Sequence, residues 1–140
     1  MSEITDPLAW VARAEEDYTV ARACLRRKKA LTSSACFHAQ QCVEKYLKGT
    51  LMARGQVFPK THDLLALSTL CAQASIFLEV TPDQLATLSS YAVQVRYPGD
   101  NPTLEEAKEA LEIAKAVRRS MRKLLGLKSR RNRRQTGGLR

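Results

Sequence analysis

The sequence predicts an all-α fold, an up-and-down antiparallel bundle of about five helices. Apolar residues recur at three- and four-residue steps along most of the chain, which is the period of an amphipathic helix. Capping residues, glycines and prolines divide this pattern into separate segments with short connections, and no segment shows the alternation of a strand. A chain of 140 residues buries about two thirds of its unfolded surface, so one domain is expected.

The first two predicted helices are the longest in the N-terminal half. Asp6 followed by Pro7 is an N-cap with proline at the first helical position, and the helix is predicted to reach about Lys29. The second helix is predicted to be capped within residues 32–34 and to stop at Gly55. Its predicted buried face consists of Ala35, Ala39, Cys42, Val43, Tyr46, Leu47, Thr50 and Leu51.

Three further helices are predicted from their start signals. Thr61 is the expected N-cap of a helix that runs to about Ala74. A fourth helix starts at Thr81-Pro82-Asp83, keeps Val95 inside and ends before the prolines of residues 98–102. Thr103 and Glu106 form a capping box for the last helix. Its predicted buried stripe is Leu104, Ala107, Leu111, Ala114, Val117, Met121 and Leu124.

The net charge of +9 is concentrated at the C-terminus. Residues 128–140 contain six basic and no acidic side chains, which leaves 17 basic and 14 acidic side chains, net +3, in residues 1–127. We therefore expect one helical domain over residues 1–127 and a basic, disordered tail over residues 128–140. The tail could bind phosphate backbones or serve only as a solvated end.

Composition also bounds the location and the chemistry. No stretch approaches the roughly 18 consecutive apolar residues of a membrane span, and the acidic N-terminus has no signal-peptide core, so a cytoplasmic protein without membrane contact is expected. The cysteines show no CxxC or zinc spacing and are expected to be small buried hydrophobes; they are Cys24, Cys36, Cys42 and Cys71. The sequence indicates no metal site and no cofactor.

The second predicted helix carries the first candidate cluster. Beside its buried face lies a second stripe made of Phe37, Gln41, Glu44, Lys45 and Lys48, with His38 on its flank. A surface ion pair between Glu44 and Lys48, worth about 0.3 kcal/mol, explains those two residues. It does not explain His38 or Gln41, so we expect this stripe to bind something.

Two other clusters follow in the chain. Lys60, Thr61, His62 and Asp63 lie where the third helix is expected to begin, and a helix N-terminus flanked by a lysine is a ready anion site. Capping alone would explain Thr61 and Asp63 equally well. Arg96 and Tyr97 lie at the expected end of the fourth helix. Arg96 could cap that helix or offer a planar fork to a phosphate.

Together these motifs resemble the HEPN domain family. The residues that carry the resemblance are Phe37-His38-Ala39-Gln40-Gln41, Glu44-Lys45, Lys48, Gly55, Lys60-Thr61-His62-Asp63-Leu64 and Arg96-Tyr97-Pro98. The resemblance implies a helical bundle that dimerises through its helices. It also implies one of two activities. Many members act with a separately encoded minimal nucleotidyltransferase, as nucleotide-binding modules or as toxins that it neutralises. Others are metal-independent ribonucleases with an arginine followed, after four to six residues, by a histidine.

The chain departs from the ribonuclease pattern. After Arg96, the positions where the histidine should stand are Asn101, Pro102 and Thr103, and a missing general acid–base group costs roughly 10²- to 10⁴-fold in rate. We therefore predict a homodimeric, non-catalytic nucleotide- or phosphate-binding module paired with a minimal nucleotidyltransferase, as in a toxin–antitoxin pair. The predicted ligand-binding residues are Gln41, Lys45, Lys60, His62, Arg96 and Tyr97.

Two alternatives remain open from the sequence. The chain could be a ribonuclease toxin in which His38 or His62, together with Arg96, replaces the missing site. It could also be a dimeric interaction protein whose basic tail binds RNA or DNA.

Overall fold

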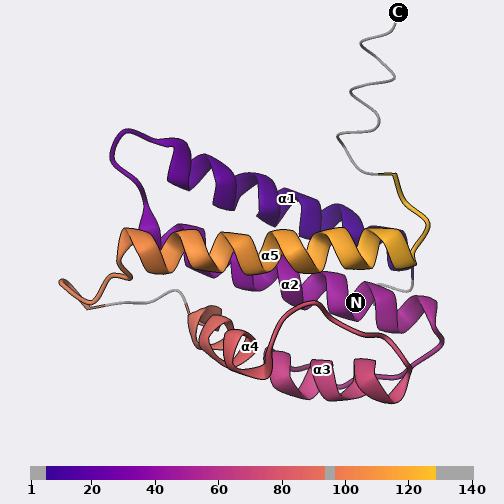
Figure 1. Cartoon of the computed structure of the whole chain (residues 1–140). Helices are drawn as coiled ribbons and strands as arrows, with labels where there is room; N and C mark the ends of the chain where they lie inside the picture. The colour runs from indigo at the N-terminus through magenta and orange to yellow at the C-terminus, as the bar shows by residue number, and fades with distance from the viewer. Residues whose placement is uncertain (1–5, 94–96, 129–140) are drawn as a thin grey trace, which may run out of the picture.

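The computed structural model describes residues 6–93 and 97–128, and this part of the chain is helical without strands (Figure 1). The elements are α1 (Pro7–Arg26), α2 (Thr32–Ala53), α3 (Leu64–Gln73), α4 (Pro82–Ser89), the 3-10 turn η1 (Ser90–Ala92) and α5 (Leu104–Leu124). The predicted all-α bundle of five helices is confirmed. None of the helices in the described ranges is long and apolar enough to cross a membrane.

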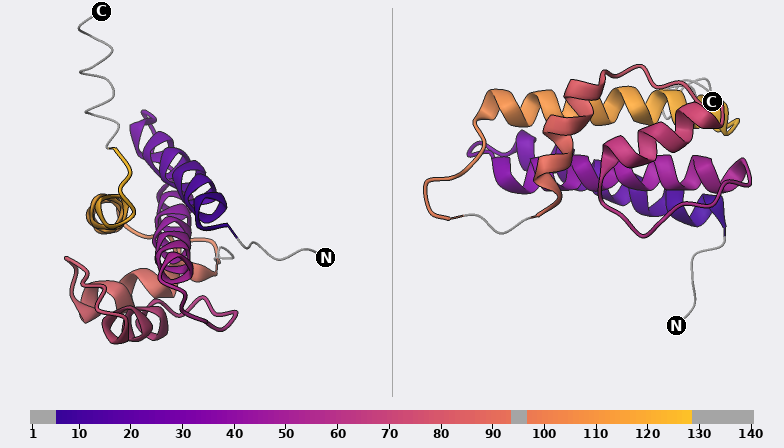
Figure 2. Two further views of the ribbon diagram at one scale, coloured as in Figure 1. Left: turned by 90° about the vertical axis from the view of Figure 1, so that its right-hand side faces the viewer. Right: turned by 90° about the horizontal axis from the view of Figure 1, so that it is seen from below.

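Helix α2 lies at the centre and contacts each of the other four helices. The view along the bundle in Figure 2 shows α1 and α5 on two sides of α2, with α3 and α4 beneath it. Helix α1 runs opposite to α2, as predicted. Helix α5 runs in the same direction as α2, because the short helices α3 and α4 carry the chain back to the end where α2 begins (Figure 1).

The start of α1 and its packing on α2 follow from local chemistry. The carboxylate of Asp6 accepts a hydrogen bond of 2.9 Å from the Leu8 N–H, and Pro7 occupies the first turn. A Cβ at Gly49 would lie 2.9 Å from the Trp10 Cβ, so glycine permits the close approach of α1 and α2. Helix α1 ends three residues before the predicted Lys29, because Arg27 is extended.

Several predicted helix starts and ends were wrong by a few residues. Leu31, not residues 32–34, is the N-cap of α2, and no side chain caps it. Asp63 caps α3 in place of Thr61, whose hydroxyl instead accepts from the Asp63 N–H. The α-helical part of α4 stops at Ser89, and Val95 lies outside the described residues. The capping box that starts α5 is confirmed, as is the stop at Gly55, whose φ of 70° suits glycine.

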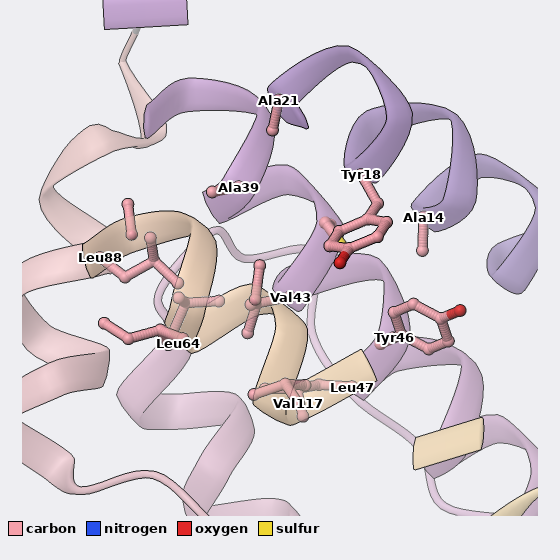
Figure 3. Packing of buried hydrophobic residues seen from close by; sticks show 14 of the residues in the cluster. Ala14, Tyr18, Ala21, Ala39, Val43, Tyr46, Leu47, Leu64, Leu88 and Val117 are labelled. Carbon is pink, nitrogen blue, oxygen red and sulfur yellow. The ribbon is translucent and has the colours of Figure 1, made fainter. Parts of the chain in front are cut away.

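The core fills the space between α2 and its neighbours (Figure 3). Tyr46 and Leu47 of α2 belong to this core together with Leu64, Leu88 and Val117 of the neighbouring helices, and all five are fully buried. The four cysteines, all within the described part of the chain, are buried thiols as predicted. Burial raises the pKa of the Cys71 thiol to about 11, so this cysteine is an unreactive part of the core.

The predicted buried stripe of α5 needed correction at both ends. Leu104 and Leu124, in the first and last turns of α5, are 42% and 41% exposed. Ala110, Ile113 and Ser120 are buried instead, which widens the buried face towards α4 and the segment between α3 and α4, where Ser120 Oγ donates to Glu79 at 2.7 Å.

Candidate functional site

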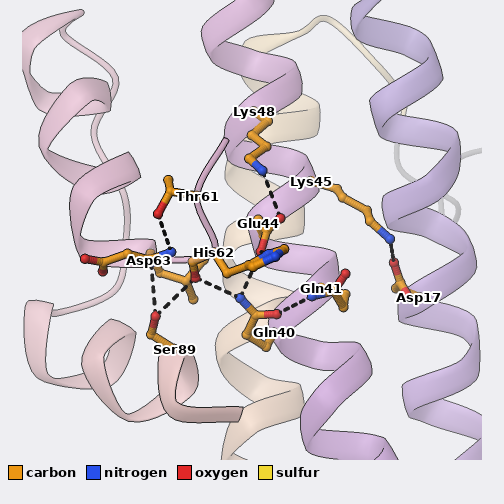
Figure 4. A network of polar contacts seen from close by, with 11 residues as sticks. Asp17, Gln40, Gln41, Glu44, Lys45, Lys48, Thr61, His62, Asp63 and Ser89 are labelled. Carbon is orange, nitrogen blue, oxygen red and sulfur yellow. Dashed lines mark hydrogen bonds and ion pairs between the residues drawn. The ribbon is translucent and has the colours of Figure 1, made fainter. Parts of the chain in front are cut away.

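A buried carboxylate on α2 is the centre of the main polar network (Figure 4). The side chain of Glu44 is only 4% exposed, and its Oε2 accepts from Lys48 Nζ at 3.0 Å. Its Oε1 lies 2.9 Å from His62 Nδ1 and accepts from Gln40 Nε2 at 3.1 Å. A buried charge needs partners of this kind because removal from water costs several kcal/mol.

The prediction of a surface Glu44–Lys48 pair was therefore wrong. The Lys48 side chain is 8% exposed, and its ammonium lies 5.6 Å from the centre of the Trp10 ring of α1. His62, from the segment between α2 and α3, reaches the other oxygen of Glu44. Because both Trp10 and His62 are distant in sequence from this pair, the period of α2 alone could not reveal that Glu44 and Lys48 are buried.

His62 has a restrained backbone and an exposed side chain. Its carbonyl accepts hydrogen bonds from Gln40 Nε2 at 3.2 Å and from Ser89 Oγ at 3.3 Å. The side chain remains 71% exposed although its Nδ1 contacts Glu44. The fold thus holds one ring nitrogen and leaves most of the imidazole open to solvent.

The predicted anion site at the N-terminus of α3 is filled by the protein itself. The Leu64 N–H donates to Ser89 Oγ at 3.1 Å, and the Leu65 and Ala66 N–H groups donate to Asp63 Oδ1 at 2.9 and 3.4 Å. The first turn of α3 is therefore satisfied and faces a carboxylate. Any anion bound here has to be held by side chains, and Lys60 is exposed three residues before Asp63.

A second network joins α1 to α2 through Asp17. Asp17 is 8% exposed, and its oxygens lie 2.8 Å from His38 Nδ1 and 2.6 Å from Lys45 Nζ. A shallow groove of about 640 Å³ runs beside this network. Its lining is Ala12, Glu15, Glu16, Asp17, Thr19, Val20 and His38, so the surroundings of His38 are acidic.

A third network connects α1 to α5 and, unlike the other two, contains no histidine among the contacts described. Arg118 donates to both carboxylate oxygens of Glu15, at 2.7 and 2.9 Å, and the Tyr46 hydroxyl donates to the same carboxylate. Burial alone would raise the pKa of Glu15, but the hydrogen bonds from Arg118 and Tyr46 and the charges of Arg118 and Arg122 outweigh it and hold this pKa below its usual value. We assign this network a structural role.

The comparisons with known proteins agree with the resemblance found in the sequence. A model of the HEPN domain matches residues 8–124. The chain belongs to the HEPN domain family.

Two solved structures are similar to this HEPN domain. TT1696 from Thermus thermophilus is 30% identical, with a TM-score of 0.65, over 84% of this chain and 96% of the other. ST0689, described as an archaeal HEPN homologue, is 24% identical, with a TM-score of 0.60, over 85% of this chain and 97% of the other, and supports the fold alone. Comparison with curated proteins gives no match.

This HEPN domain brings some of the predicted site residues together and separates others. Gln41 donates to Gln40 Oε1 at 2.6 Å and so joins the Glu44 network, together with His62. Lys45 instead belongs to the Asp17 network. Tyr97 is 82% exposed, and Arg96 lies outside the described residues.

Sequence reasoning missed the acidic partners of these residues. Asp17 lies three residues after Ala14 and four before Ala21, both fully buried, so its position beside the apolar stripe of α1 was a usable signal. Gln40 lies four residues before Glu44 on the buried side of α2, which is the same kind of signal. Within the described residues, no three His, Cys, Asp or Glu side chains gather as a metal ion would require.

Proposed function

We propose that this HEPN domain is a phosphate-binding accessory module whose ligand is a nucleotide held by His62 and Lys60. The observation that carries the proposal is the anchored but exposed imidazole of His62, 71% exposed with its Nδ1 2.9 Å from the buried Glu44. A histidine that served only to satisfy Glu44 would not need such exposure, since Lys48 and Gln40 already contact this carboxylate.

The charges around His62 favour an anion when the imidazole is protonated. Glu44 and Lys48 cancel each other, and Asp63 offsets Lys60, so the protonation of His62 makes the cluster positive. With Nδ1 at Glu44, the other ring nitrogen can donate to a phosphate oxygen, and Lys60 adds a second donor.

Arg96 and Tyr97 are the further ligand-binding residues that the sequence suggests. The exposed ring of Tyr97 could stack on a base, and a guanidinium at Arg96 could add a bidentate contact to phosphate. Gln41 and Lys45 are less available to bind a ligand, because each already contacts another side chain of the protein.

The proposed partners follow from the family rather than from the site. We propose that the chain forms a homodimer and acts with a separately encoded minimal nucleotidyltransferase, as in a toxin–antitoxin pair. Co-purification with the product of a neighbouring gene, and the mass of the assembly in solution, test this part directly. A monomer that recruits no such enzyme would contradict it.

Calorimetric titration of ATP into the full chain, at about 150 mM salt, tests the site. Lys60→Ala is expected to weaken binding roughly tenfold, because it removes a hydrogen bond to a charged group. Lys28→Ala, which removes an exposed lysine from the connection between α1 and α2, is the charge-matched control and should bind like the original chain. Equal losses in the two variants, or no saturable binding at all, would reject the site.

A second candidate function, RNA cleavage, is favoured by the contact between His38 and Asp17. A carboxylate 2.8 Å from Nδ1 orients the imidazole as in known acid–base sites, and His38 lines a groove. The acidic lining of that groove disfavours a polyanion. Growth arrest on expression, relieved by His38→Ala and not by His62→Ala, would establish this function, and absence of toxicity and of RNA cleavage would dismiss it.

A further inference from the structure

The acidic residues of this chain stop well before its C-terminus, whereas its basic residues continue to the end. All 14 acidic residues occur at or before Glu112, whereas 11 of the 23 basic residues follow it. Residues 1–112 therefore carry 12 basic and 14 acidic side chains, net −2, and residues 113–140 carry net +11. Such an asymmetry is a property of chains that bind polyanions.

Helix α5 arranges part of this charge as a surface. Lys115, Arg119 and Lys123 recur every four residues, about 6 Å apart along the axis, and all three are exposed. They lie opposite the side of α5 that is buried against the bundle, where Ala114, Val117 and Met121 pack. We call these three residues the α5 basic face.

Neighbouring acidic groups offset only part of the charge of the α5 basic face. Glu112 lies one turn before Lys115 on the same side of α5, and both are exposed. Glu79 is the carboxylate nearest to Arg119, at 3.8 Å, and both side chains are about 60% exposed, so this pair contributes little. Along the edge that faces α1, the single carboxylate of Glu15 is shared by Arg118 and Arg122, at 2.7 and 3.9 Å, which leaves one positive charge in excess.

We propose that the α5 basic face binds the phosphate backbone of a nucleic acid without reading its sequence. A membrane surface is disfavoured, because a helix that lies on a bilayer needs an exposed apolar face, and α5 buries its apolar side against the bundle. The lysine and arginine spacing supplies one phosphate contact per helical turn, and six further basic residues follow α5 in the sequence, within residues 128–140. This surface is independent of the proposed nucleotide site at His62.

Fluorescence anisotropy with a labelled single-stranded RNA of about 20 nucleotides tests the proposal on the full chain. The triple variant K115Q/R119Q/K123Q should bind at least about tenfold more weakly at near-physiological salt. The slope of log affinity against log salt should also fall by about 2, since each phosphate contact to a single strand contributes about 0.7. DNA of the same sequence should bind similarly, because backbone contacts carry no base information.

The matched control is R27Q/K28Q/K29Q, which removes the same charge from exposed positions in the connection between α1 and α2. Figure 1 shows this connection at the opposite end of the bundle from the C-terminal half of α5. The control should retain most of the affinity and the salt slope. Equal losses in both triple variants would overturn the proposal, because they would show an effect of net charge alone.

Three further measurements complete the test. Replacing the four arginines of residues 130–134 by glutamine should weaken RNA binding, and combining this change with the α5 triple variant should weaken it further. If the arginine variant lost all RNA binding while the α5 triple variant bound normally, the proposal would be overturned. Vesicles with anionic lipid should bind more weakly than the RNA, and tighter vesicle binding would overturn it as well. Thermal unfolding followed by circular dichroism confirms that the exposed substitutions leave the bundle folded.

Discussion

Both histidines place Nδ1 against a carboxylate, but the surroundings of the two rings differ. His38 Nδ1 lies 2.8 Å from Asp17, and His62 Nδ1 lies 2.9 Å from Glu44, so a nearly buried carboxylate anchors each ring. The side chain of His38 is 25% exposed and that of His62 is 71% exposed. A carboxylate–histidine contact alone therefore does not indicate a function.

The surroundings explain the two roles that we assign. His38 packs between α1 and α2, with the Phe37 ring 5.1 Å away and the acidic groove beside it. His62 projects from the segment before α3 and has Lys60 two residues away. The same contact closes a helix interface in one region and presents an imidazole to solvent in the other.

The largest expected difference between the two regions is in the cost of losing the carboxylate. Glu44→Ala leaves the Lys48 ammonium buried without its partner and should reduce the free energy of unfolding by about 3–5 kcal/mol. Asp17→Ala should cost less, about 1–3 kcal/mol, because the Lys45 side chain is 20% exposed and can reach water. Urea unfolding followed by circular dichroism measures both values, and the reverse order would contradict the burial of the Glu44 network.

The network of Glu15 predicts how the stability of the bundle depends on pH. Its partners, Arg118 and Tyr46, keep their protons near neutral pH, so the change comes from Glu15. Its pKa is lower in the folded chain than in the unfolded chain, so its contribution is present above the unfolded pKa and is lost as the pH falls through the folded pKa. Glu15→Gln should therefore destabilise the bundle by about 2 kcal/mol near neutral pH and by less in acid. A difference that stays constant down to about pH 3 would show that Glu15 has no such role.

Replacing each histidine should have a smaller effect, again unequal between the two. His38→Ala removes a half-buried ring between two helices and should cost about 1–2 kcal/mol. His62→Ala should cost under about 1 kcal/mol, because the ring is exposed and Glu44 keeps Lys48 and Gln40. Thermal unfolding of the two variants measures which loses more stability. A larger loss in His62→Ala than in His38→Ala would contradict the expectation.

The smallest expected effect is in ligand binding. His62→Gln should weaken ATP binding a few-fold, because it removes the exposed ring that lies close to Lys60. His38→Gln should bind ATP like the original chain. Calorimetry of the three chains measures the change, and equal affinities would show that His62 does not contact the ligand.

The sequence was informative where local chemistry decides the structure. Asp6-Pro7, Gly55 and the Thr103–Glu106 capping box start or stop helices through contacts within four residues, so they were predictable. The predicted N-cap of α3 was wrong because Thr61 and Asp63 can both cap a helix. The hydrogen bond from the Leu64 N–H to Ser89 Oγ favours the later start, at Asp63.

The polar networks could not be predicted because each depends on distant partners. Glu44 meets His62 across 18 residues, Asp17 meets Lys45 across 28, and Glu15 meets Arg118 across 103. The periodicity of α2 identified its polar residues correctly. It could not show that Glu44 and Lys48 lie under Trp10 and His62 rather than in solvent.

The most direct test of the proposed phosphate site uses the fact that the chain has two histidines. Long-range ¹H–¹⁵N correlation spectra show the ring nitrogens of both, and the variants His38→Gln and His62→Gln assign them. On addition of ATP near pH 6.5, the resonances of His62 should shift in a saturable manner while those of His38 stay in place. Shifts at His38 alone, or at neither ring, would contradict a phosphate site at His62.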